Sequence, residues 1–152
     1  MSDNLTNSIS IPSDSDGFVI LQCSLCSEFF KITPTDFEEE SQLQIWCPSC
    51  GLNPESFLTN EVMDLAKRIV INSVSDLIDG FNKEMNGIFK SGNLRYKPGS
   101  KIKKEVINPI VSQLENLEIN VYDCCHKVAK ISPSLKMEGG YCPFCGEMQN
   151  GN

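Results

Sequence analysis

The feature that most constrains this chain of 152 residues is the placement of its eight cysteines in four close pairs. Three pairs have the form Cys-x-x-Cys and the fourth is directly adjacent: Cys23/Cys26, Cys47/Cys50, Cys142/Cys145 and Cys124/Cys125. Two such pairs can supply the four thiolates of a tetrahedral structural zinc site. The pattern occurs twice, so we expect the chain to bind two Zn2+ ions as cofactors.

The first predicted site consists of two Cys-x-x-Cys pairs, Cys23/Cys26 and Cys47/Cys50, that are separated by 20 residues. This spacing is specific for metal binding. Thiol redox chemistry is the alternative, but a redox Cys-x-x-Cys normally opens a helix after a strand. Paired cysteines in a reducing compartment are also more often ligands than disulfides.

The second predicted site combines Cys142/Cys145 with the adjacent pair Cys124/Cys125. Neighbouring residues of an extended strand point to opposite faces, so joint ligation by an adjacent pair requires a bend. The only histidine, His126, follows directly and is an alternative ligand. We favour Cys124 together with Cys125.

The two cysteine-rich segments look like copies of one unit. In each copy a proline, Pro34 or Pro133, lies eight residues after the second cysteine. Each copy then ends in a Cys-Pro-x-Cys-Gly turn. Aligning cysteine with cysteine requires a deletion of Ser24-Leu25 from the second copy, which places Cys124 over Cys23 and Cys125 over Cys26.

These motifs resemble those of the zinc-ribbon (rubredoxin-like) class, over about residues 18–52 and 118–148. The resemblance implies that two turns at the tips of β-hairpins clamp one structural zinc in each ribbon. It implies a fold element and no activity. The expected fold is therefore α+β, with two small β zinc ribbons flanking a central long α-helix.

The helix is predicted from apolar residues that recur at spacings of three and four between Val62 and Phe89. It should start at Asn60 and stop before Gly92, with a kink or break allowed at Gly80 or Gly87, since each glycine costs about 1 kcal/mol. The apolar stripe is too broad for one ribbon to cover. It predicts packing against both ribbons, or a coiled-coil homodimer through helix 60–90.

A basic segment follows the helix, although the formal net charge of the chain is −7. A basic groove with an aromatic ring can follow phosphates and stack on a base. The candidate nucleic-acid-binding residues are Lys90, Arg95, Tyr96, Lys97, Lys101, Lys103 and Lys104. The overall negative charge opposes this role, so we favour a solvated loop, or one that pairs with the acidic run Asp36–Glu40.

The sequence divides into five parts: a disordered tail (1–16), an N-terminal ribbon (17–53), a long amphipathic helix (54–92), a basic loop and linker (93–116) and a C-terminal ribbon (117–152). The first residues lack a basic and apolar leader, and no apolar stretch approaches the ~20 residues of a membrane span. We therefore expect a cytoplasmic protein with no membrane association.

The expected function is non-enzymatic: an interaction or adaptor protein whose ribbons and helix bind a protein partner of unknown identity. A nucleic-acid-associated regulatory factor that uses residues 90–104 is the alternative. Four cysteine ligands leave no coordination position for an activated water, which disfavours hydrolytic chemistry. The sequence contains no phosphate-binding loop or nucleophile motif, and the acidic run Asp36–Glu40 is interpreted as a solvated loop.

Overall fold

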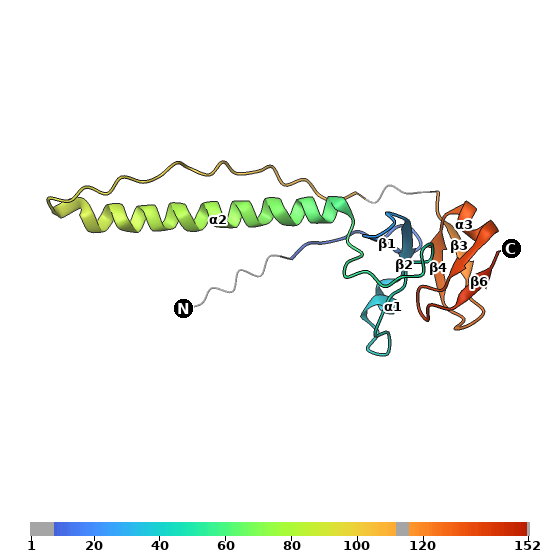
Figure 1. The fold of residues 1–152 in the computed structure, drawn as a ribbon. Coiled ribbons are helices and arrows are strands. Elements are labelled where there is room, and N and C mark those ends of the chain that lie inside the picture. The colour runs from blue at the N-terminus through green and yellow to red at the C-terminus, as the bar shows by residue number, and fades with distance from the viewer. Residues whose placement is uncertain (1–7, 112–115, 152) are drawn as a thin grey trace. The chain divides into compact units, whose positions relative to one another are not determined.

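The structure, a computed structural model, describes residues 8–111 and 116–151 (Figure 1). It divides into two compact units. The helical unit contains Glu61–Pro109, and the cysteine-rich unit contains Ser10–Asn60 and the chain from Ile110 onward. The predicted α+β class is confirmed: one long helix lies, along the sequence, between segments that form short antiparallel strands.

Four strands of the cysteine-rich unit form one antiparallel sheet, in the order β1-β2-β4-β3. The strands are β1 (Val19–Gln22), β2 (Phe29–Ile32), β3 (Glu118–Val121) and β4 (Val128–Ile131). Each copy contributes one hairpin, and the hairpins join where Lys31 of β2 pairs with Lys130 of β4. The sequence predicted two ribbons, but it did not reveal that they share a sheet.

Each inner strand leads into a short helix with the same start signal. Helix α1 (Pro34–Glu38) is capped by Thr33, whose Oγ1 accepts a hydrogen bond from the Asp36 N–H. Helix α3 (Pro133–Glu138) is capped by Ser132 in the same way. Proline at the first helical position is favoured because its missing N–H is not needed there. A second sheet follows α3 and pairs β5 (Gly139–Tyr141) with β6 (Met148–Asn150).

The hydrophobic core of the cysteine-rich unit is built from both copies. It consists of Leu21, Phe30, Ile32, Ile45, Tyr122, Ala129, Ile131, Cys142 and Phe144. The Phe30 ring is fully buried and meets Phe57 edge to face, at 5.5 Å between centroids. A single ribbon buries little apolar surface, so sharing one core makes each copy depend on the other.

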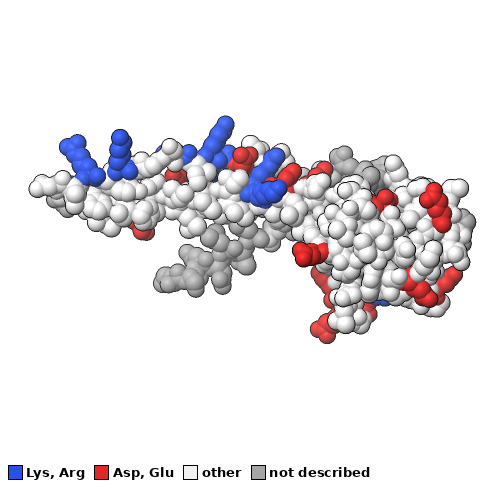
Figure 2. Space-filling model, in the orientation of Figure 1, with Lys and Arg blue, Asp and Glu red and all other residues white. Residues whose placement is uncertain are grey.

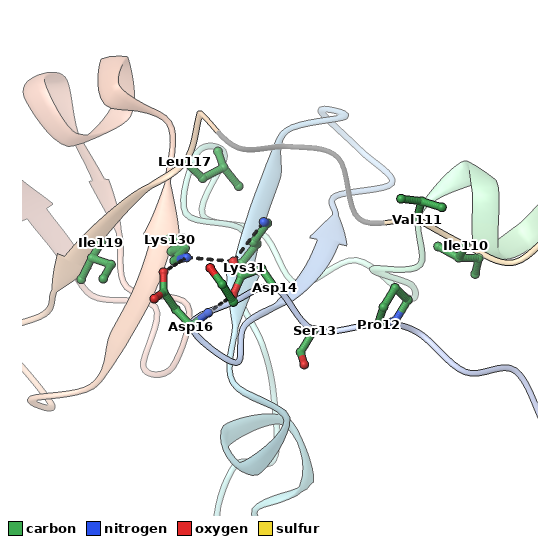
Figure 3. A pocket seen from close by; sticks show the side chains of 11 residues that line it. Pro12, Ser13, Asp14, Asp16, Lys31, Ile110, Val111, Leu117, Ile119 and Lys130 are labelled. Carbon is green, nitrogen blue, oxygen red and sulfur yellow. Dashed lines mark hydrogen bonds and ion pairs between the residues drawn. The ribbon is translucent and has the colours of Figure 1, made fainter.

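Two lysines face one another at the junction of the hairpins, and both are buried. One carboxylate oxygen of Asp14 lies 3.1 Å from Lys31 Nζ and 2.8 Å from Lys130 Nζ. Asp16 lies 2.6 Å from Lys130 Nζ. Figure 3 shows this cluster in the lining of a groove of about 770 Å³. Both aspartates belong to the segment expected as a disordered tail, yet both are ion-paired.

The helical unit is dominated by α2 (Asn60–Ile88), which continues into a short 3-10 turn, η1 (Phe89–Ser91). The long helix predicted from the sequence is therefore confirmed. It passes through Gly80 and Gly87 without a break, so the allowed interruption does not occur. Among the described residues, a Cβ at either glycine would meet nothing within 4 Å.

The chain after Gly92 returns along α2 as an extended segment, here called the strap (residues 92–109; Figure 1). Asn72 holds it by two hydrogen bonds to the Glu105 backbone, of 3.0 and 2.8 Å. The Ser75 hydroxyl donates to the Ile102 carbonyl, and Arg68 donates to the Val106 carbonyl. These side chains satisfy strap backbone groups that no sheet ladder satisfies.

Candidate metal centres

The first candidate centre gathers Cys23, Cys26, Cys47 and Cys50, as predicted. Cys23 and Cys26 come from the turn between β1 and β2. The Sγ atoms of Cys23 and Cys50 lie 3.8 Å apart, and those of Cys26 and Cys47 lie 3.5 Å apart. A tetrahedral zinc with Zn–S bonds of about 2.3 Å requires sulfur separations of about 3.8 Å, so this group can hold a metal ion.

The second candidate centre gathers Cys124, Cys125, Cys142 and Cys145. The Sγ atoms of Cys125 and Cys142 lie 3.5 Å apart, and those of Cys124 and Cys145 lie 3.2 Å apart. As in the first centre, the four sulfurs all lie within 4.8 Å of one another. None of the eight cysteines forms a disulfide. Two four-cysteine groups therefore have the arrangement of metal ligands.

All four cysteine turns close with the same backbone step. The residue after the last cysteine of each turn has a positive φ: 64° at Ser27, 70° at Gly51, 58° at His126 and 74° at Gly146. Its N–H donates a hydrogen bond back across the turn, as from Gly51 to the Cys47 carbonyl (2.9 Å). Glycine adopts this conformation without a steric cost, whereas Ser27 and His126 adopt it because the turn requires it.

The expected deletion in the second copy is wrong. The Cys23 N–H donates to the Glu28 carbonyl, and the Tyr122 N–H donates to the Lys127 carbonyl, both at 2.9 Å. The first turns of the two copies therefore have the same length. Tyr122 occupies the backbone position of Cys23. The missing cysteine is replaced by Cys124, two residues later, at the position equivalent to Leu25.

This alignment explains how adjacent cysteines can share one centre. Residues 123–125 form a tight turn rather than a strand, which supplies the bend that joint ligation requires. Cys125 lies where Cys26 lies in the first copy, and His126 lies where Ser27 does. The second group contains four sulfurs and does not include His126, whose side chain is exposed.

The two centres interlock through their second turns. The Trp46 N–H donates to the Pro143 carbonyl at 2.9 Å, and the Tyr141 N–H donates to the Pro48 carbonyl at 2.8 Å. Each of these aromatic residues immediately precedes a cysteine of its own centre. A Cβ on Gly146 would lie 3.0 Å from the Trp46 ring, and one on Gly51 would lie 2.9 Å from the Tyr141 ring. Each centre is therefore packed by a residue of the other copy.

The thiols differ in how readily they ionise without a metal. Burial raises the pKa of Cys47 and of Cys142 well above the usual range of a thiol. Burial also opposes ionisation of Cys23, but backbone N–H groups of Cys26 and Leu25 outweigh it and lower its pKa. Four thiolates in one place repel each other unless a cation is present. A divalent ion reverses this balance, because coordinated thiols are deprotonated.

The predicted nucleic-acid-binding residues lie in η1 and along the strap, and none of them lines the groove beside Asp14. The basic side chains are exposed, and Figure 2 shows lysine and arginine along one edge of the helical unit. Lys104 is ion-paired with Asp76. The Tyr96 hydroxyl donates to Asn82 at 2.6 Å, and its ring stacks on Phe89 with centroids 6.4 Å apart.

Sequence reasoning missed two ionic clusters. One joins Lys127 to the acidic run Asp36–Glu40, and the other contains Lys31 and Lys130. Lys127, from the second copy, lies 3.5 Å from Asp36 and 2.5 Å from Glu39. It also lies over the Phe144 ring at 5.2 Å. The lysine cluster had one signal in the sequence: Lys31 and Lys130 occupy equivalent positions in the two copies. A lysine in a strand is normally interpreted as solvent-facing.

Comparisons with models of known protein families, with curated proteins and with solved structures found no match to this chain. The resemblance to zinc ribbons therefore depends on the cysteine turns and on their geometry. Within the part of the chain that the structure describes, no helix is long and apolar enough to cross a membrane.

Proposed function

We propose that this chain is a zinc-stabilised interaction protein of the adaptor type, with two structural Zn(Cys)4 sites and no enzymatic activity of its own. The observation that carries the proposal is the gathering of eight thiols into two groups of four. Zinc fits these groups because four thiolates in a tetrahedron are its typical structural ligand set. Each complete set leaves no coordination position for a substrate or an activated water.

The proposed role of the metal is to stabilise the core that the two copies share. Cys47 and Cys142 are buried, and the backbone on either side of them pairs with the other copy. Binding of zinc to small sites is worth about 10–16 kcal/mol and is largely folding free energy. Loss of metal from one centre is therefore expected to loosen both halves of the cysteine-rich unit.

The adaptor role is supported by apolar surface that the helical unit leaves exposed. Six large apolar side chains of α2 are among its exposed residues: Met63, Val70, Val74, Leu77, Phe81 and Ile88. Contiguous exposed apolar surface on a soluble protein usually marks a contact with another macromolecule. A cytoplasmic location remains part of the proposal, because reducing conditions keep the thiols available as ligands.

Native mass spectrometry of the purified chain tests the metal assignment. We expect a mass increase of two zinc ions, which chelation removes together with the near-ultraviolet circular dichroism signal of the aromatic core. A chain isolated without metal, with its cysteines joined as disulfides, would overturn it. Capture of partners by zinc-loaded protein, compared with a Leu77→Asp variant, tests the adaptor role. Equal capture would show that the exposed apolar surface of α2 is not involved.

A second candidate function, nucleic-acid binding, is favoured by the exposed basic side chains of the strap. Fluorescence anisotropy with single- and double-stranded oligonucleotides at low salt tests it. Binding should weaken steeply as salt is raised, because phosphate contacts release counterions. Lys97→Glu with Lys101→Glu should abolish binding, and no binding at low salt would exclude this function.

A further inference from the structure

Six of the seven large apolar residues that α2 exposes form a regular seam, and the seventh, Ile71, lies beside it. Counting from Met63, steps of four and three residues alternate to the end of the helix and define eight positions. These are Met63, Lys67, Val70, Val74, Leu77, Phe81, Glu84 and Ile88. The six apolar members each expose 40–67% of their surface. A repeat that averages 3.5 residues is the signature of a coiled-coil interface.

The seam lies on the face of α2 away from the strap. The strap is held by Arg68, Asn72 and Ser75, which project from one side of the helix. At about 100° per residue, the apolar seam positions centre roughly 150° around the helix from those three. The strap therefore leaves the seam uncovered. Phe81 is a partial exception, since its ring lies edge to face with that of Tyr96, with ring centroids 6.4 Å apart.

We propose that α2 pairs with α2 of a second copy of this chain in an antiparallel two-stranded coiled coil. The two charged seam positions fix the orientation and the register. When Lys67 faces Glu84 of the second copy, the other facing pairs are all apolar. They are Met63 with Ile88, Val70 with Phe81, and Val74 with Leu77. A two-fold axis passes between the Val74 and Leu77 pairs, so each facing pair occurs twice in the dimer.

A parallel pair in register would place Lys67 against Lys67 and Glu84 against Glu84. Like charges within a coiled-coil seam are unfavourable, because both are partly desolvated there. In the antiparallel arrangement both pairs become opposite in charge. The symmetric placement of these two residues about the centre of the seam therefore selects one orientation and disfavours the other.

The glycines of α2 agree with this arrangement. Ala66, Ser73, Gly80 and Gly87 recur every seven residues along one flank of the seam. In an antiparallel pair this flank meets the same flank of the second copy, so small side chains allow close approach of the helices. Contacts within the described part of its own chain require neither glycine, since a Cβ on either would meet nothing there within 4 Å.

Pairing of α2 helices does not require bound metal, because all eight seam positions lie in the helical unit and none of the cysteines does. Each α2 begins at Asn60, where the chain leaves its cysteine-rich unit. In an antiparallel pair the two helix starts lie at opposite ends, about 40 Å apart for a helix of this length.

Charge reversal in the whole 152-residue chain tests the proposal by sedimentation velocity. Lys67→Glu and Glu84→Lys should each raise the dimer dissociation constant about tenfold or more, because both facing pairs become like-charged. The double variant restores opposite charges and should dimerise as the original chain does. Mixing the two single variants should give heterodimers in preference to homodimers. Lys83→Glu, off the seam, is the matched control and should change nothing.

Three outcomes would overturn the proposal. A chain that stays monomeric at every concentration has no self-association, and its seam would serve another partner. Single variants that dimerise like the original chain would indicate a parallel pair, in which reversing both members of a like-charged pair leaves it like-charged. Failure of the double variant to recover would show that Lys67 and Glu84 do not meet. Zinc content and helicity are measured for each variant, so loss of fold or metal is distinguished from loss of pairing.

Discussion

Tyr122 takes the backbone position in the second β-hairpin that Cys23 takes in the first. Both donate a 2.9 Å hydrogen bond across a turn of the same length, and both are buried. Cys23 directs its sulfur to the first centre, whereas Tyr122 packs edge to face on Phe144 in the core. The second centre therefore takes its fourth sulfur from Cys124, which is exposed.

Moving the fourth cysteine of the second centre from position 124 to position 122 should preserve that centre. Cys124→Ser should leave three thiolates there and weaken its hold on zinc. Tyr122→Cys combined with Cys124→Ser should recover a second zinc in native mass spectrometry, because residue 122 occupies the place of Cys23. The fold is expected to lose about 3 kcal/mol with the aromatic ring, so metal content is the readout. Failure to recover the second zinc would contradict the equivalence of residues 122 and 23.

The second centre should release its metal first. Cys23 and Cys47 of the first centre are buried, whereas only Cys142 is buried in the second. An incoming chelator needs access to the metal through its ligands, so we expect two phases of zinc release. The fast phase should disappear in Cys124→Ser, and the slow phase should disappear in Cys23→Ser. If Cys23→Ser removed the fast phase instead, the first centre would be the one that releases its zinc first.

Gly146→Ala should destabilise the protein more than Gly17→Ala. Both glycines have a positive φ, which costs about 1–2 kcal/mol for another residue. A Cβ on Gly146 would also press on the Trp46 ring at 3.0 Å, whereas one on Gly17 would meet nothing within 4 Å. We expect an additional loss of about 1 kcal/mol at Gly146, measured by denaturation of zinc-loaded protein. Equal losses would show that the Trp46 contact is not tight.

Trp46 also offers a direct optical test, since it is the only tryptophan. Its ring lies against Gly146, next to a ligand of the second centre, although Trp46 belongs to the first copy. Its fluorescence should therefore change during the fast phase of zinc release. A signal that changes only in the slow phase would indicate that the two copies do not interlock in solution.

Asp14→Asn should cost about 3 kcal/mol of unfolding free energy, because it leaves two buried lysines without their shared carboxylate. Asp16→Asn is the matched control and should cost less, since its side chain is half exposed and contacts only Lys130 among the two. Calorimetry of the zinc-loaded proteins measures both. Equal effects of the two variants would contradict the central role of Asp14.

The contribution of Asp14 should depend on pH. Burial opposes its ionisation, but hydrogen bonds from Lys130, the Phe18 N–H and Lys31 hold its pKa far below the usual range. A carboxylate with a depressed pKa stabilises the fold above its unfolded value of about 3.9, and this contribution is lost as pH falls below that value. The difference between the original chain and Asp14→Asn should be constant from pH 8 to about 5.5 and shrink below about 4.

Local patterns were sufficient for several features. The cysteine pairs identified all eight sulfurs that the structure gathers, because a tight turn places its two cysteines together whatever surrounds it. The long helix followed from its apolar periodicity. The short helices α1 and α3 were not predicted, although a capping residue followed by proline, Thr33-Pro34 or Ser132-Pro133, stands at the start of each. The alignment of the two copies was wrong at the adjacent cysteines Cys124 and Cys125. Matching cysteine with cysteine suggested a deletion, whereas the backbone hydrogen bonds of the turn fix its length.

The sequence by itself thus determined the repeat, the four cysteine turns and the long helix, which depend on residues close together along the chain. Only the tertiary structure decided that the two copies form one sheet and share one core. It also placed Lys31 against Lys130, with Asp14 between them, and each second turn under an aromatic ring of the other copy. The contacts between the copies join residues about a hundred positions apart, and they bury apolar surface that a copy of about 35 residues could not bury alone.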